Sequence, residues 1–247
     1  MEKKKKAFRS RVFGTDLNDC IWAVQEWNID IRDFSLFLTG ESMQYDSDDQ
    51  GLRNEPGVEY QMSARLIKNL RLLASIDSAR PILIHMKTCG GDWTEGMAIY
   101  DALRATPNRI VIVNYTHARS MSSLIFQAAD KRVMMPNSHF MFHDGELFVG
   151  GTYRGTITNV RWAEKERPTM FNIYVERMKE RGKFRRWSQE NIREMLEEQM
   201  EKKEDVFLTA QEAMDWGLAD EIFDGNWEQL KKKFPRTRIH PVQIVKT

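Results

Sequence analysis

Cysteine is scarce in this chain, and Cys20 and Cys89 are its only two. They lie far apart without metal-ligand spacing, which gives no support for a disulfide framework or a zinc site and fits a reducing compartment. Long apolar runs are also missing, because none approaches the ~18 residues of a membrane-spanning helix. The basic start, residues 1–6, is not followed by the apolar segment of a secretion signal. We therefore expect a cytoplasmic protein.

An excess of either charge is missing too. Lys and Arg total 37 against 36 Asp and Glu, so the net charge provides no attraction to nucleic acid or to an anionic membrane surface. We expect neither of these as a partner. The 247 residues, 41% of them hydrophobic, suffice for one large domain or two small ones, and we favour one.

Short apolar runs alternate with segments whose apolar residues recur at helical spacing. The runs predict buried strands at 34–40, 81–86, 109–114, 131–135 and 139–142. The helical segments are 61–75, 96–105 and 120–129, and a polar loop is expected at 41–58. This alternation predicts an α/β fold of stacked β-strand and helix units.

A long charged segment, 156–204, interrupts that alternation. Its pattern is helical, breaks at 181–182, and restarts at Ser188, which has the character of an N-cap before an acidic first turn. Further along, a short helix capped by Thr209 and a last strand at 218–223 are predicted. We therefore expect a helical arm beside the α/β core.

Four short segments carry residue types suited to acyl transfer. Residues 88–91 end in two glycines, 118–122 hold a serine at a predicted helix start, 141–144 hold a histidine after a strand, and 204–210 offer a carboxylate ahead of a helical stretch. An activated serine needs an oxyanion hole, a nucleophile, a base and a carboxylate. Each segment alone is a weak signal, since such a serine is usually a cap and paired glycines are usually a turn.

Together, the order and spacing of the segments are more specific. Gly91 and Ser120 stand 29 residues apart, the turn 135–138 reads Met-Pro-Asn-Ser ahead of His143, and Asp205 precedes Val-Phe-Leu-Thr-Ala. In these motifs the chain resembles the family of ClpP, the proteolytic subunit of the caseinolytic (Clp) protease. Members of that family are serine peptidases with a crotonase-like α/β fold.

The resemblance implies a single peptidase domain over residues 1–247. Its core would be 34–224, with 1–33 as an N-terminal segment and 225–247 as a C-terminal tail. The implied fold is crotonase-like, of the ClpP type, with a protruding helical arm. The implied activity is that of a serine endopeptidase that hydrolyses unfolded polypeptides to short peptides within an oligomeric ring chamber, with no cofactor and no metal.

The resemblance also assigns roles to individual residues. Ser120 would be the nucleophile, and His143 would be the base that takes its proton. Asp205 would hold the imidazole in one tautomer and stabilise the imidazolium. The backbone N–H groups of Gly91 and Met121 would form the oxyanion hole. Asp205 has a competing interpretation, because the acidic residues around it also suit a solvated helix face.

For the assembly, the resemblance implies heptameric rings stacked face to face as a tetradecamer. Residues 153–178 would form the arm at the ring-to-ring contact. An AAA+ unfoldase is a candidate partner that would feed polypeptide into the chamber. The charged start of the chain, residues 1–11, departs from the family's usual N-terminal segment.

Other departures from the family pattern lie near the implied site. Cys89 stands where the family usually has proline, and we interpret it as an inert packing residue. His117 and Arg119 replace small residues before the nucleophile, and His117 is not expected to face the serine. The pair Lys203 and Glu204 reverses the order of charges in the family's ring-to-ring bridge.

Other interpretations of the function stay open. A ring subunit without catalytic activity would keep the fold, although an intact Ser120, His143 and Asp205 argue against it. A crotonase-type acyl-CoA enzyme would share the fold and the glycine-built oxyanion hole, although the serine after a strand favours a peptidase. A phage-type head-maturation protease would differ from the leading interpretation only in its substrate.

Overall fold

A computed structural model describes residues 17–40 and 55–232. The strands form one sheet in the order β1-β2-β3-β4-β5-β8, and β6 and β7 branch from it because β6 pairs with β4 and β7 with β6. The pairs β1–β2 and β6–β7 are antiparallel and the others are parallel. The strands are β1 (Ile29–Asp30), β2 (Ser35–Thr39), β3 (Ile82–Thr88), β4 (Ile110–Arg119), β5 (Lys131–Met134), β6 (His139–Phe142), β7 (Val206–Thr209) and β8 (Glu221–Ile222). The predicted α/β class is confirmed, with a mostly parallel sheet.

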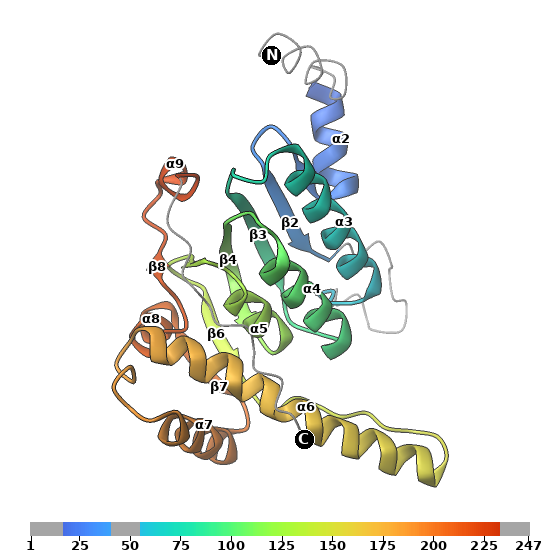
Figure 1. Ribbon diagram of the computed structural model, residues 1–247, viewed down its shortest axis with the longest axis vertical. Helices are drawn as coiled ribbons and strands as arrows, with labels where there is room; N and C mark the ends of the chain where they lie inside the picture. Colours follow the sequence, from blue (N-terminus) through green and yellow to red (C-terminus); the bar gives the residue numbers. More distant parts are fainter. Residues whose placement is uncertain (1–16, 41–54, 233–247) are drawn as a thin grey trace, which may run out of the picture.

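Helices cover one face of this sheet, with α3, α4 and α5 lying side by side against it (Figure 1). Their apolar side chains and those of β2, β3 and β4 form the main core. A smaller apolar cluster on the other face is covered by Leu230 of α9. The helices are α2 (Leu17–Trp27), α3 (Tyr60–Ile76), α4 (Trp93–Ala105), α5 (Met121–Gln127), α6 (Tyr153–Glu180), α7 (Gln189–Lys203), α8 (Ala210–Trp216) and α9 (Trp227–Leu230).

The predicted strands and helices between 61 and 142 are present, with one strand much longer than expected. Strand β4 continues to Arg119, because β6 pairs with its second half after β5 has paired with its first half. The apolar run ended at Asn114 in the sequence, and the polar residues beyond it are held in the strand by this second partner. The extension brings the end of β4 to the start of α5.

Two differences lie near the end of the described chain. The stretch after Asp205 begins with a strand, β7, rather than a helix, and Thr209 then caps α8 through a reciprocal capping box with Glu212. The last strand is limited to Glu221–Ile222. It starts late because the N–H groups of Leu218 and Ala219 bond back to a carbonyl of α8 and cannot join the sheet.

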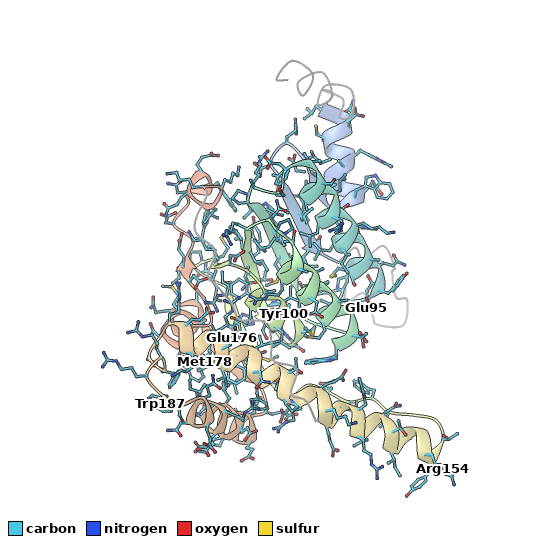
Figure 2. All side chains as sticks on the ribbon, viewed as in Figure 1. Glu95, Tyr100, Arg154, Glu176, Met178 and Trp187 are labelled. Atoms are coloured by element: carbon cyan, nitrogen blue, oxygen red, sulfur yellow. The ribbon has the colours of Figure 1, made fainter. Side chains whose placement is uncertain are left out.

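The predicted arm is helix α6, which projects beyond the body of the molecule (Figure 1). Figure 2 shows Arg154 at the outer tip and Met178 at the opposite end, where the helix crosses the core. Every buried residue of α6 follows Pro168, so the inner half is packed and the outer half is exposed. Helix α7 restarts as predicted, with the Ser188 side chain accepting from the N–H of Asn191.

Three of the expected segments lie partly outside the described residues: 1–16 of the N-terminal segment 1–33, 41–54 of the loop 41–58, and 233–247 of the tail 225–247. Within residues 17–40 and 55–232, no helix is both long enough and apolar enough to cross a membrane.

Candidate active site

Ser120 lies in the turn between β4 and α5, at the N-cap position of the helix. Its backbone has φ 51° and ψ −130°. Positive φ is uncommon for residues other than glycine, and such strained conformations cost about 1–3 kcal/mol. The hydroxyl is directed away from its own helix, toward the end of the neighbouring strand β6.

His143 directly follows that strand. Because β6 runs parallel to the second half of β4, with Met141 paired to Arg119, both strands end at the same edge of the sheet. The N–H of Ser120 donates to the carbonyl of Met141 at 3.2 Å. This pairing brings the imidazole to the serine, with His143 Nε2 2.8 Å from Ser120 Oγ.

Asp205 directly precedes β7, which runs antiparallel to β6 with Val206 opposite Phe142. The register therefore places Asp205 opposite His143, and its Oδ1 lies 3.2 Å from the imidazole Nδ1. When Nδ1–H donates to this carboxylate, Nε2 keeps the lone pair that accepts the serine O–H. The His143 side chain is 16% exposed and that of Asp205 is 43% exposed, so the carboxylate is in contact with solvent.

Two glycines bring a third segment to the turn. Gly90 and Gly91 follow β3 with φ of 106° and 136°. A Cβ on Gly90 would lie 2.7 Å from the Cβ of Ser120 and 3.1 Å from the backbone N of Met121, and a Cβ on Gly91 would lie 2.4 Å from the backbone of Val58. Only glycine permits this close approach. Gly91 and Met121 were predicted from the sequence to line the site, whereas Gly90 was not, although it belongs to the same pair.

A cavity of about 490 Å³ opens beside His143 and Asp205. Four more carboxylates line it, those of Asp144, Glu146, Glu201 and Glu204. Arg167 of α6 pairs with Asp144, with 2.8 Å between Nε and Oδ1, and the hydrogen bond to Asp144 holds the pKa of the guanidinium above its ordinary value. Carboxylates therefore predominate on this side of the imidazole, and Arg167 offsets the charge of Asp144.

His117 and Cys89, which are close to the site in sequence but were not expected to take part in it, have other partners. His117 Nε2 lies 2.7 Å from a carboxylate oxygen of Glu55, which confirms that the ring does not face Ser120. The Cys89 thiol donates to the carbonyl of Glu55 at 3.5 Å. Burial, together with the negative charge of Glu55, raises the pKa of this thiol, and a protonated thiol is a poor nucleophile.

Of the three side chains at the edge of the sheet, Ser120 and His143 are placed to exchange a proton, and Asp205 is placed to orient the imidazole. A serine hydroxyl can pass its proton to an imidazole that a carboxylate holds in place, and the oxygen then attacks a carbonyl carbon. In the part of the chain that the structure describes, no group of three or more His, Cys, Asp or Glu side chains is arranged to hold a metal ion.

Comparison with known proteins gives consistent matches. The sequence model of the Clp protease family matches residues 49–226. The "ATP-dependent Clp protease proteolytic subunit" of Deinococcus radiodurans is 29% identical over 169 residues, which are 68% of this chain and 76% of that protein. The "ATP-dependent Clp protease proteolytic subunit 1" of Leifsonia xyli subsp. xyli is 32% identical over 155 residues, 62% of this chain and 72% of that protein.

The family match and the fold agree with each other. The matched region contains β3 to β8, including the glycine pair, the turn at Ser120, and the strands that end at His143 and begin after Asp205. It covers well over half of the chain. On this evidence the chain belongs to the Clp protease family.

Proposed function

We propose that this protein is a serine endopeptidase of the ClpP type, which hydrolyses unfolded polypeptides to short peptides inside an oligomeric chamber. The observation that carries the proposal is the continuous contact from Ser120 Oγ to His143 Nε2, 2.8 Å, and from His143 Nδ1 to Asp205 Oδ1, 3.2 Å. Both distances are of hydrogen-bond length. Membership of the Clp protease family is independent support.

In the proposed reaction, Ser120 Oγ attacks the carbonyl carbon of a peptide bond while His143 Nε2 takes the hydroxyl proton. The imidazolium gives that proton to the leaving amine as the C–N bond breaks, and an ester of Ser120 remains. A water molecule then attacks the ester, with His143 again as base, and restores the serine. Asp205 holds the imidazole tautomer and stabilises the imidazolium without accepting the proton.

The oxyanion of each tetrahedral intermediate needs donors close to Ser120. We assign these to the backbone N–H groups of Gly91 and Met121, each of which lowers the barrier by about 2.7–4 kcal/mol in sites of this kind. The close approach of Gly90 to the Cβ of Ser120 and to the backbone of Arg119 and Met121 supports this assignment, because it holds the glycine pair against the turn.

The assembly that we propose is a pair of stacked heptameric rings, with the arm at their contact. Large apolar side chains are exposed on the arm and on the segment leading into it, including Phe148 (88%), Tyr153 (81%) and Trp162 (60%). Exposed apolar groups gathered on one segment are typical of a surface that another protein covers.

Because the named relatives are subunits of ATP-dependent proteases, we propose an AAA+ unfoldase as the source of polypeptide.

Labelling with a fluorophosphonate probe, followed by intact-mass analysis, tests the activity. We expect one probe per wild-type chain and none on Ser120→Ala, because the probe reacts with a serine that a base has activated. Native mass spectrometry of the same samples measures the oligomer. An unlabelled wild type in a correctly sized oligomer would contradict the peptidase proposal and favour a ring subunit without catalytic activity.

Replacing Gly90 with alanine should push the glycine pair away from the turn at Ser120 and so displace one oxyanion donor. We expect the labelling rate to fall by at least ~10²-fold, the effect of losing one such donor. The new Cβ would lie 2.7 Å from the Cβ of Ser120 and 2.8 Å from the carbonyl of Arg119, at φ 106°. Gly150→Ala is the matched control, because nothing lies within 4 Å of a Cβ there. Equal labelling rates for the two variants would show that the glycine pair does not shape the site.

A further inference from the structure

The turn at Ser120 is held by the hydroxyl groups of the two serines that follow it. Ser122 Oγ donates to the carbonyl of Arg119 at 2.7 Å and accepts from its N–H at 3.0 Å. Ser123 Oγ donates to the carbonyl of Ser120 at 2.6 Å. Both side chains are fully buried. A serine at positive φ persists only where its surroundings over-determine it, and these bonds are part of that constraint.

Tyr174 of α6 completes the second contact, since its hydroxyl lies 2.6 Å from Ser123 Oγ. The carbonyl of Ser120 can only accept, so Ser123 uses its single O–H there and its oxygen accepts the O–H of Tyr174. Burial raises the pKa of Tyr174 despite the hydrogen bond with Ser123, which keeps the phenol protonated as a donor. Donation therefore runs from Tyr174 through Ser123 to the backbone of the nucleophile.

The ring of Tyr174 also packs on the strand that leads to His143. Its centroid lies 6.2 Å from that of Phe140, nearly edge-on, and 5.7 Å from that of Phe142. Glu176 and Met178 mark this inner part of α6 in Figure 2, where it crosses the core. One side chain of α6 thus contacts both the strand that ends at the base and the helix that follows the nucleophile.

We propose that Tyr174 is a positioning residue for Ser120, acting through the Ser123 hydroxyl. The inference rests on the proposed function and adds to it a residue from outside the four motifs. Without the Tyr174 O–H, Ser123 can turn its hydroxyl away from the carbonyl of Ser120, and the strained turn loses one of the bonds that hold it. Ser120 Oγ is then aligned with His143 in a smaller fraction of molecules, while the surface that binds substrate is unchanged.

Tyr174→Phe tests this by removing the O–H and keeping the ring. We expect the maximal rate constant of fluorophosphonate labelling to fall about tenfold, the effect of one hydrogen bond, with the probe concentration at half-maximal rate unchanged. Tyr100→Phe in α4 is the matched control, because Tyr100 is 2% exposed and Tyr174 is 1% exposed. The Tyr100→Phe variant should be labelled like the wild type.

A double-mutant test isolates the hydrogen bond itself. In a Ser123→Ala background, Tyr174→Phe should have no further effect on the labelling rate, because the hydrogen bond between the two hydroxyl groups is already absent.

Amide hydrogen exchange over residues 119–124 provides a readout that needs no activity. Exchange should become faster in Tyr174→Phe and not in Tyr100→Phe. If the wild type is not labelled but exchange responds in this way, the proposed function is wrong and the positioning role stands. If the wild type is labelled and Tyr174→Phe is labelled equally fast, the positioning role is wrong and the proposed function stands. Unchanged exchange in an unlabelled protein would overturn both.

Discussion

Replacing Asp205 with asparagine is expected to lower kcat by about 10⁴-fold while the protein stays folded. The amide keeps the size of the carboxylate, but its NH₂ group can donate to Nδ1 and so stabilise the tautomer that carries its proton on Nε2. In that tautomer His143 cannot accept the proton of Ser120. Because the Asp205 side chain is 43% exposed, the substitution buries no new polar group, and we expect the free energy of unfolding to remain close to that of the wild type.

Asp144→Asn is the matched control for this prediction. Asp144 also lines the cavity beside His143, but its carboxylate pairs with Arg167 rather than with the imidazole. Turnover of an unstructured polypeptide should therefore be nearly normal in Asp144→Asn. Comparable kcat values for Asp205→Asn and the wild type would mean that another acidic residue orients His143, or that none is needed.

Replacing Asp220 with asparagine is expected to lower the free energy of unfolding by about 3–5 kcal/mol, the usual cost of removing one partner from a buried ion pair. The Asp220 carboxylate accepts hydrogen bonds from Nε and Nη2 of Arg132 at 3.0 and 2.7 Å. The Asp220 side chain is 8% exposed and that of Arg132 is 1% exposed. The substitution leaves the guanidinium of Arg132 buried without its charge partner. Urea denaturation followed by circular dichroism measures the loss.

Asp215→Asn, an exposed position on the neighbouring helix α8, is the control and should change the unfolding free energy by less than about 0.5 kcal/mol. Equal urea midpoints for the two variants would show that the Arg132–Asp220 pair contributes no net stability.

The same ion pair predicts a dependence of stability on pH. Burial alone would raise the pKa of Asp220, but the charge of Arg132 and its hydrogen bonds outweigh burial and lower it below the ordinary value of 3.8. A carboxyl whose pKa is lower in the folded state stabilises the fold above its unfolded pKa, and this stability is lost as the pH falls through the folded pKa. The difference between the wild type and Asp220→Asn should therefore shrink below about pH 3.8.

Much of the fold could be predicted from sequence because it depends on local properties. The segments 81–86 and 131–135 are strands, since each is short, contains apolar or β-branched residues, and is bounded by turn residues. Ser188 and Thr209 cap helices as predicted, because a cap depends only on a side chain and the N–H groups within the next turn. The order of the four motifs was likewise sufficient to indicate the family.

Tertiary structure alone decided how those motifs meet. The apolar run of strand β7, Val-Phe-Leu-Thr, is too short to be told apart from the helix that follows it by a local pattern, yet its register against β6 sets Asp205 opposite His143. The second half of β4 is a strand only because β6 pairs with it. Tyr174 contacts Ser123, 51 residues away in the sequence, and Asp220 pairs with Arg132, 88 residues away in the sequence. Contacts of this kind depend on strand register and helix packing across the chain, which no local pattern of residues encodes.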